Sequence, residues 1–156
     1  MGCGSRIVSE AIPSEARPDL SHEIELTPAF HDLDPMDIVW HGNYVKYLEI
    51  ARNALMAKFG YDYPQMRESG YAWPIVDMRM KYVGSIHYGQ RVRIRATIVE
   101  WENRLRIDYL VICAETGARL HKASSIQVAL CIATREMCWV CPPVLFERLG
   151  VKGPQP

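Results

Sequence analysis

One long helical pattern followed by a series of strand patterns constrains the fold of this chain more than any other feature. Apolar residues recur at helical spacing from Asn43 to about Phe59, and Gly60 ends the pattern. From Trp73 onward apolar and polar residues alternate with the period of half-buried strands, over residues 76–82, 92–98, 105–113 and 120–132. Short turns such as Glu102-Asn103 join these segments, which indicates an antiparallel meander. Because a single helix can cover one face of such a sheet, we expect an α+β fold.

The flanking segments complete one domain. Residues 23–30 alternate like a strand before the helix, and the Pro142-Pro143 pair introduces a short terminal helix over residues 142–149. The long helix is apolar around most of its circumference, which is typical of a helix wrapped by other structure. Residues 1–20 mix Gly, Ser, Pro and charge without periodicity, so we expect a loosely ordered tail there. We place the domain at residues 21–150 and a C-terminal tail at residues 151–156.

Charge and hydropathy exclude several classes of function. Lys and Arg together number 18, and so do Asp and Glu, so no net field attracts nucleic acid or an anionic membrane. No apolar run approaches the roughly 18 residues that cross a membrane. Residues 1–20 also lack the apolar stretch of a secretory signal. We therefore expect a cytoplasmic protein that binds no nucleic acid and has no membrane span.

The five cysteines are irregularly spaced. Cys138 and Cys141 form a C-x-x-C pair, a spacing that redox and zinc sites use. No second pair and no His pair completes a zinc set, and the segment does not open a helix after a strand. We interpret the cysteines as packing thiols in a reducing compartment, and we expect neither a metal nor a cofactor.

A carboxylate and a histidine lie seven residues apart just before the long helix. Asp34 precedes Pro35 in an expected turn, and His41-Gly42-Asn43-Tyr44 leads into the helix, with Asn43 a favourable N-cap residue. Backbone N–H groups at a helix start carry partial positive charge and lack intrahelical partners. A carboxylate aimed at that start can attack a carbonyl or activate water, while the N–H groups hold the oxyanion. The pattern indicates acyl transfer, although a turn Asp and a capping His would explain each residue taken alone.

These residues also carry a family resemblance. Asp34-Pro35, Ile38 to Tyr44, Tyr47-Leu48-Glu49 and Arg52 resemble the active-site segment of hotdog-fold acyl-CoA thioesterases, nearest to the 4-hydroxybenzoyl-CoA thioesterase and YbgC-like group. The resemblance covers residues 23–150, and its motif is confined to residues 32–52. It implies a hotdog fold, in which an antiparallel sheet wraps around one long central helix. It also implies a homodimer or homotetramer with a continuous sheet and active sites shared between subunits.

The resemblance assigns roles to individual residues. Asp34 matches the family's catalytic Asp, which acts as nucleophile or as general base for water, and the sequence leaves this choice open. His41 matches a position whose backbone N–H points at the thioester carbonyl, and its imidazole could assist proton transfer. Asn43 and Tyr44 are expected to bind the substrate. Arg104 is expected near the phosphates of coenzyme A, with a solvated turn Arg as the alternative.

The implied reaction is hydrolysis of an acyl-CoA thioester to a free acid and coenzyme A. The alternative is a non-catalytic hotdog module that binds acyl-CoA or an acyl carrier protein. The sequence leaves open the acyl chain and the choice between coenzyme A and acyl carrier protein as its carrier.

Three features depart from the family pattern. Asp37 stands where many relatives have Gly, which places a bulkier, charged residue in the turn. Phe30 stands where some YbgC-like members have Tyr, so any role of that hydroxyl is absent. His31, Asp32 and Asp37 crowd one loop and could suggest a metal site, but neither helical nor hairpin spacing supports coordination.

Overall fold

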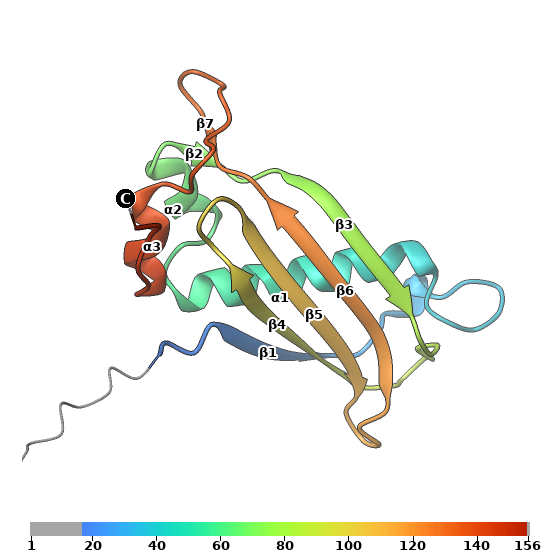
Figure 1. The fold of residues 1–156 in the computed structure, drawn as a ribbon. Coiled ribbons are helices and arrows are strands. Elements are labelled where there is room, and N and C mark those ends of the chain that lie inside the picture. Colours follow the sequence, from blue (N-terminus) through green and yellow to red (C-terminus); the bar gives the residue numbers. More distant parts are fainter. Residues whose placement is uncertain (1–16, 156) are drawn as a thin grey trace, which may run out of the picture.

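A five-stranded antiparallel sheet is the largest part of the fold in the computed structural model, which describes residues 17–155 (Figure 1). Its strands are β1 (Ser21–Leu26), β3 (Ile75–Tyr82), β4 (Val92–Glu100), β5 (Leu105–Cys113) and β6 (Arg119–Gln127). A separate two-stranded ribbon pairs β2 (Tyr71–Ala72) with β7 (Leu130–Cys131). The helices are α1 (Tyr44–Lys58), α2 (Tyr63–Glu68) and α3 (Pro143–Leu149). The fold is therefore α+β, as predicted.

The strand order in the large sheet is β1-β4-β5-β6-β3. β4, β5 and β6 form the expected meander. β3 does not pair with β4, the next strand in the chain; it lies at the opposite edge and pairs with β6, with Tyr82 opposite His121 and Ile75 opposite Gln127. The prediction of one meander from residue 76 onward was wrong for β3, because the connection over residues 83–91 carries the chain across the sheet.

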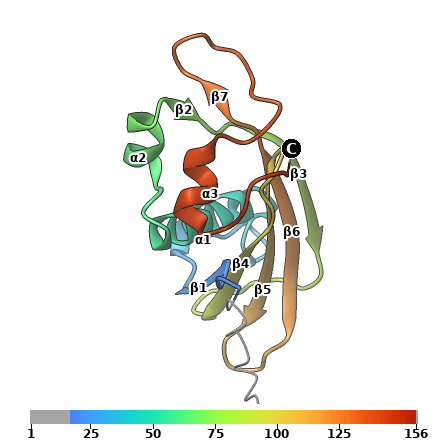
Figure 2. The same cartoon turned by 60° about the vertical axis from the view of Figure 1, so that its left-hand side comes forward.

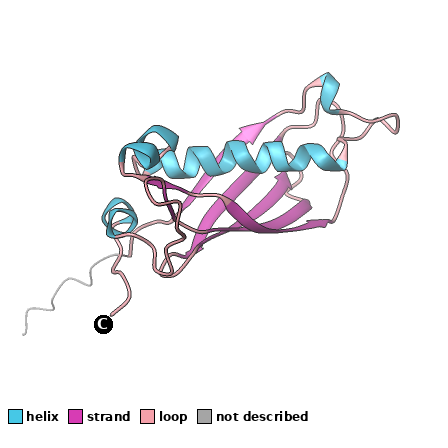
Figure 3. Ribbon diagram, turned by 90° about the horizontal axis from the view of Figure 1, so that it is seen from above, coloured by secondary structure: helices cyan, strands magenta, loops and turns pink. Residues whose placement is uncertain are grey.

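Helix α1 lies across one face of the sheet (Figure 3). Its buried residues include Leu48, Ala51 and Leu55, which join one core with the inward-facing side chains of β4 and β5. On the other side of the helix, Val45 and Ile50 are 43% and 48% exposed. The prediction of a helix enclosed on most sides therefore holds for its inner side only, because one sheet reaches one side of a helix.

Element boundaries differ from the predictions where turn residues intervene. The strand expected over residues 23–30 ends at Leu26, before Pro28. The strand expected over residues 120–132 divides into β6 and β7. Helix α2 was not predicted, although Asp62 and Gln65 cap its start reciprocally and Pro64 occupies its first turn. The terminal helix lies where we expected it, as α3.

The three helices lie on the same side of the sheet (Figure 2). None of the helices within residues 17–155 is long and apolar enough to cross a membrane.

Cys138 and Cys141 are free thiols, and burial raises the pKa of Cys141 to about 12. Cys3 and most of the expected N-terminal tail fall within residues 1–16, outside the described residues.

Candidate active site

The Asp34 carboxylate lies in a tight turn between β1 and α1. Its Oδ1 accepts a hydrogen bond from the Met36 N–H at 2.8 Å, and the Asp34 N–H donates to the Ile38 carbonyl at 2.8 Å. An antiparallel bridge between Leu33 and Val39 closes the turn. Local backbone groups therefore hold the carboxylate by one oxygen, and the side chain stays partly exposed.

The neighbouring carboxylate, Asp32, points into the protein and is 2% exposed. It accepts hydrogen bonds from the Lys46 ammonium, from the Tyr47 hydroxyl at 2.7 Å and from the Ala29 N–H at 3.1 Å. Burial alone would raise the pKa of Asp32, but the hydrogen bonds from Lys46 and Tyr47 outweigh it and lower the pKa. Asp32 therefore fastens the Asp34 loop to α1.

Sequence reasoning missed this anchor. No spacing rule links Asp32 to Lys46 and Tyr47, because the chain must turn back before α1 can meet the loop. Within residues 17–155, no three His, Cys, Asp or Glu side chains come together in a way that could hold a metal ion.

His41 begins a short 3-10 helix, His41–Asn43, that leads directly into α1. The N–H groups of His41 and Gly42 open this turn and have no acceptor within the helix. A Cβ at Gly42 would lie 2.2 Å from the Trp40 ring, so a larger residue there would push this half-exposed ring aside. The Tyr82 hydroxyl donates to the His41 carbonyl at 2.6 Å. The helix start is therefore fixed from β3, and its first two N–H groups have no hydrogen-bond acceptor among the described residues.

The structure corrects the capping role expected for the Asn43 side chain. Its side chain makes no capping hydrogen bond to α1; instead Nδ2 donates to the Asp32 carbonyl at 2.9 Å. The Asp32 carbonyl lies within hydrogen-bond distance of the Asn43 side-chain amide, so the amide bonds to the loop. A 3-10 turn leads into α1 and takes the place of a side-chain cap. Asn43 therefore holds the loop against the helix start.

One cavity brings the main sequence candidates together. It has a volume of about 290 Å³, and Asp34, His41 and Tyr44 line it, with Tyr82 from β3. Its other walls come from the loops on either side, through Ile38, Val39, Val83, Gly84 and Ser85. Asp34 and His41, the first residue of the helix start, thus line one space. This arrangement can hold an acyl carbonyl and bring a nucleophile to it.

Behind this cavity lies an aromatic cluster that sequence reasoning did not identify. The His121 ring packs against the rings of Tyr44 and Tyr82, with centroid distances of 4.6 Å for both. His121 is fully buried, neither ring nitrogen has a hydrogen-bond partner among the described residues, and burial lowers its pKa to about 4. The alternation of β6 could have placed His121 on its inner face, but the contact depends on β3 pairing with β6.

The structure shows the surroundings of Asp37 and Phe30, the two single residues that depart from the family pattern. Asp37 has a φ of 61°, in the left-handed region where Gly is favoured and Asp is tolerated. Gly would adopt this conformation without strain. Phe30 is 78% exposed and packs edge-to-face on Tyr88 at 6.1 Å. Neither residue lines the Asp34 cavity.

Arg104 lies elsewhere in the chain. It is in the β4–β5 hairpin, at the end of the sheet where Leu105 pairs with Gln127, and it does not line the Asp34 cavity. Its Nε donates to Glu100 at 2.9 Å, which raises the pKa of Arg104. Within one chain, the structure therefore does not bring Arg104 to Asp34 and His41.

Comparison with known sequences places the chain in a family. Residues 28–148 match the family described as the thioesterase-like superfamily. A Synechocystis protein named as an esterase is 30% identical over 120 residues, which cover 76% of this chain and 72% of the relative. A Bacillus subtilis protein named as an acyl-CoA thioesterase, YneP, is 31% identical over 77 residues, which cover 49% of this chain and 56% of the relative.

Solved structures with the same fold include two thioesterases. A 4-hydroxybenzoyl-CoA thioesterase in complex with 4-hydroxybenzoyl-CoA superposes with a TM-score of 0.74 at 22% identity, covering 83% of this chain and 99% of that chain. A 1,4-dihydroxy-2-naphthoyl-CoA thioesterase from Synechocystis gives a TM-score of 0.75 at 18% identity, covering 83% and 96%. These likenesses confirm the hotdog fold, and with the sequence matches they show that this chain belongs to the thioesterase-like superfamily.

Proposed function

We propose that this protein hydrolyses an acyl-CoA thioester to a free acid and coenzyme A, with Asp34 as the catalytic carboxylate. One observation carries the proposal: Asp34 and the start of the helix at His41 line the same cavity. The name of the B. subtilis relative supports thioester hydrolysis. A module that only bound acyl-CoA would need the cavity but would have no use for a carboxylate in it.

The geometry supports one order of events. The thioester carbonyl oxygen lies toward the N–H groups of His41 and Gly42, which hold the negative charge that develops on it. Asp34 either takes a proton from a water that attacks the carbonyl carbon, or attacks that carbon itself. In the first route the C–S bond of the water adduct breaks, and the proton held by Asp34 passes to the departing sulfur, which gives the free acid and coenzyme A. In the second route the thiolate of coenzyme A leaves as an anhydride forms between the acyl group and Asp34, and water then hydrolyses this anhydride to the free acid and the Asp34 carboxylate.

Coenzyme A is the carrier that we propose. The solved relatives include a 4-hydroxybenzoyl-CoA complex and a Staphylococcus aureus protein in complex with CoA, with a TM-score of 0.77 at 14% identity. An Arabidopsis acyl-acyl carrier protein thioesterase is 26% identical over 77 residues, which cover 40% of that relative, so an acyl carrier protein is the second candidate.

We place the reaction in the cytoplasm, where Cys113, Cys131, Cys138 and Cys141 would remain thiols.

The site as proposed is completed by a second copy of the chain. Strand β3 is an edge strand, and Ile75 and Val76 expose 38% and 57% of their surface. At the other edge, Arg91 and Arg93 of the β4 region pair with Glu25 and Glu23, so charge protects β1. Antiparallel pairing of two β3 strands about a two-fold axis would continue the sheet across a homodimer, and a homotetramer could pair two such dimers.

This pairing would bring the two ends of the sheet together. The Tyr82 end of one β3 strand would lie beside the Ile75 end of its partner. The Asp34 cavity of one protomer would then face the opposite end of the partner's sheet, where Arg104 lies. We therefore assign Tyr44 and the His41 start to the substrate in one chain, Asn43 to positioning the loop, and Arg104 to the coenzyme A phosphates across the interface.

A panel assay tests the proposal. Purified protein is incubated with aromatic and aliphatic acyl-CoA thioesters, and a thiol reagent detects the coenzyme A that is released. We expect turnover of at least one thioester, and its loss in Asp34→Asn. Binding of acyl-CoA without any thiol release would favour the binding module, and turnover only with acyl-acyl carrier protein would change the carrier.

A further inference from the structure

The Tyr82 hydroxyl makes one strong hydrogen bond, to the carbonyl group at the start of the long helix. It donates to the His41 carbonyl oxygen at 2.6 Å, whereas the Met80 sulfur, a weak acceptor, lies 4.0 Å away. A hydroxyl has a single proton, so the His41 carbonyl receives it. Tyr82 is the last residue of β3 and His41 opens the 3-10 helix before α1, so this bond joins the sheet edge to the helix start.

The hydrogen bond from Tyr82 fixes a whole peptide group. The His41 carbonyl and the Gly42 N–H belong to one trans peptide, in which the C=O and N–H bonds point in opposite directions. A donor that holds the carbonyl therefore also sets the direction of the Gly42 N–H. It polarises the peptide as well, and such cooperativity strengthens the next hydrogen bond by roughly 10–30%. The Gly42 N–H has no acceptor among the described residues, so it can bind a ligand oxygen.

Two buried rings hold the Tyr82 ring from the inside. Its centroid lies 4.9 Å from that of Tyr44 and 4.6 Å from that of His121, and both contacts are edge-to-face. Tyr44 and His121 also contact each other, at 4.6 Å. Tyr82 itself is 47% exposed, so its position depends on this inner pair of rings. Because Tyr82 lies opposite His121 in the sheet, the register of β3 and β6 determines where the hydroxyl lies.

Tyr82 remains a donor at neutral pH. Burial raises the pKa of its hydroxyl above the ordinary value of 10.0, so the proton stays on the oxygen. His41 and Tyr82 both line the Asp34 cavity, so the peptide that Tyr82 holds lies at the wall of the site. An N–H fixed in advance at that wall needs no rearrangement when charge develops on a substrate oxygen.

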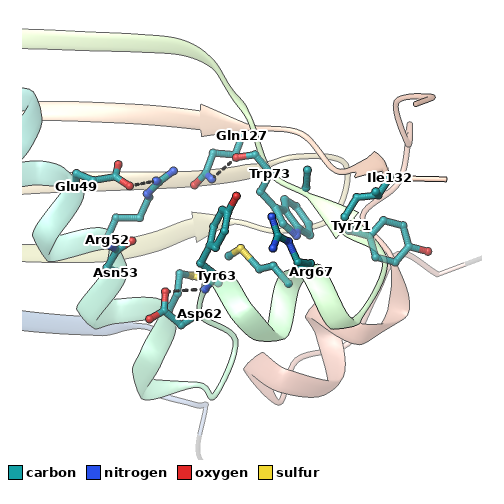
Figure 4. Close-up of a pocket in the computed structure, with 13 residues that line it drawn as sticks. Glu49, Arg52, Asn53, Asp62, Tyr63, Arg67, Tyr71, Trp73, Gln127 and Ile132 are labelled. Carbon is teal, nitrogen blue, oxygen red and sulfur yellow. Dashed lines mark hydrogen bonds and ion pairs between the residues drawn. The ribbon is translucent and has the colours of Figure 1, made fainter. Parts of the chain in front are cut away.

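The other end of β3 lies beside a different cavity (Figure 4). Ile75 pairs with Gln127, which lines a cavity of about 430 Å³ between α1 and α2. His41, Tyr82 and His121 do not line this second cavity. Substitutions at Tyr82 and His121 therefore act at the Asp34 end of the sheet and should leave the second cavity as it is.

We infer that Tyr82 is a positioning residue for the oxyanion, which acts through the His41–Gly42 peptide, and that His121 keeps the Tyr82 ring in place. The inference rests on the proposed function, because it concerns the carbonyl of the same thioester. Negative charge collects on the carbonyl oxygen as the carbon is attacked. The Gly42 N–H, directed and polarised by the Tyr82 hydroxyl, binds this oxygen most strongly in the transition state. Tyr82 itself neither gains nor loses a proton in the reaction.

Steady-state kinetics of Tyr82→Phe, which removes the hydroxyl and keeps the ring, give the first test. The Gly42 N–H remains, so the loss should be smaller than the 10²–10³-fold that follows removal of an oxyanion donor. We expect kcat to fall by about tenfold with KM nearly unchanged, since the lost stabilisation belongs to the transition state. Tyr88→Phe is the matched control, because Tyr88 is 65% exposed, packs on Phe30 and does not line the Asp34 cavity. An unchanged kcat in Tyr82→Phe would overturn the inference.

A single peptide resonance reports the contact directly. His41-Gly42 is the only His-Gly pair in the sequence, so protein labelled with ¹³C at the His carbonyl and ¹⁵N at Gly gives one correlation in an HNCO spectrum. Tyr82→Phe should shift this resonance in the ligand-free protein, and Tyr88→Phe should not. His121→Ala should shift it in the same direction, and His121→Phe, which keeps a ring, should restore it. A lower kcat in Tyr82→Phe without a shift would mean that the hydroxyl acts on the substrate itself, and would overturn the inference.

Infrared spectroscopy of a bound thioester separates the two proposals. The Asp34→Asn variant is loaded with 4-hydroxybenzoyl-CoA or dodecanoyl-CoA carrying ¹³C in the thioester carbonyl, so no turnover is needed. Hydrogen bonding from the helix start lowers the carbonyl stretching frequency, and adding Tyr82→Phe should reduce this shift. The same result in a protein whose wild type releases no thiol from any thioester would reject hydrolysis and support the positioning role alone. Equal carbonyl bands with and without the Tyr82 hydroxyl would overturn that role.

Discussion

The carboxylate of Asp32 accepts a hydrogen bond from the Tyr47 hydroxyl of α1 at 2.7 Å, whereas the carboxylate of Asp34 faces a cavity. Two like side chains in one loop thus have opposite surroundings. The buried one fixes the loop, and the partly exposed one is free to react. Because the first positions the second, substitutions at the two residues should separate stability from catalysis.

Asp34→Asn should abolish turnover and leave the fold intact. Asn keeps the size and the oxygen that accepts from the Met36 N–H, but it cannot act as base or nucleophile. Loss of a positioned base costs roughly 10²–10⁴-fold in rate. Steady-state assays with the best thioester measure the effect. Asp37→Asn is the control, because Asp37 lies in the same loop outside the cavity. Near wild-type kcat in Asp34→Asn would refute the proposed chemistry.

His41 should act mainly through its backbone. His41→Ala retains the N–H and is expected to lose less activity than Asp34→Ala. His41→Pro removes the donor at the start of the 3-10 helix and should reduce kcat by about 10²–10³-fold, as when one oxyanion donor is removed. Circular dichroism and thermal melting establish that the Pro variant is folded. A folded, fully active His41→Pro enzyme would remove His41 N–H from the mechanism.

Asp32→Ala should destabilise the protein more than Asp34→Ala does. It leaves the buried Tyr47 hydroxyl without its acceptor and separates Lys46 from its carboxylate. Hydrogen bonds to charged groups contribute about 1.5–3 kcal/mol each, and the half-exposed Lys46 regains water, so we expect a loss of about 2–3 kcal/mol. Urea unfolding of both variants measures the difference. Similar losses for the two would show that Asp32 does not anchor the loop.

Much of the fold was predictable because its signals are local. The period of α1 and the alternation of β4 and β5 each depend on neighbours within a few residues. The position of β3 was not predictable in the same way, since it follows from pairing with β6, from Tyr82 opposite His121 to Ile75 opposite Gln127, far along the chain. Helix α2 did carry a local signal, the Asp62 and Gln65 cap, which sequence reasoning overlooked.

The residues of the candidate site also differ in how far they could be predicted from local sequence. Asp34, His41 and Tyr44 lie within eleven residues and could be linked through the helix-start argument. Tyr82 lines the Asp34 cavity and His121 packs behind it, and the contact between them exists only because two distant strands pair.

His121 should make stability depend on pH. Burial lowers its pKa in the folded state to about 4, below the value of about 6.5 of an unfolded chain. The unfolded state therefore binds more protons between these values, and stability falls as the pH drops from about 6.5 to about 4, by about 3 kcal/mol at most. Chemical unfolding of wild type and His121→Phe across this range measures it. The Phe variant should lose the slope, whereas His31→Gln, at an exposed position, should keep it. Parallel curves for wild type and His121→Phe would contradict the assignment.

The protein should be an oligomer assembled through β3. A glutamate at Val76 would place a charge in the seam between two paired β3 strands, where it would lose contact with water. We therefore expect Val76→Glu to weaken the dimer by at least about tenfold in Kd and to lower activity in proportion to the monomer formed. Val99→Glu is the control, because Val99 is 43% exposed on β4, which lies inside the sheet and has both edges paired. Sedimentation equilibrium at micromolar concentration should show a dimer or tetramer for wild type and Val99→Glu. A monodisperse and fully active wild-type monomer would rule out a site shared between two chains.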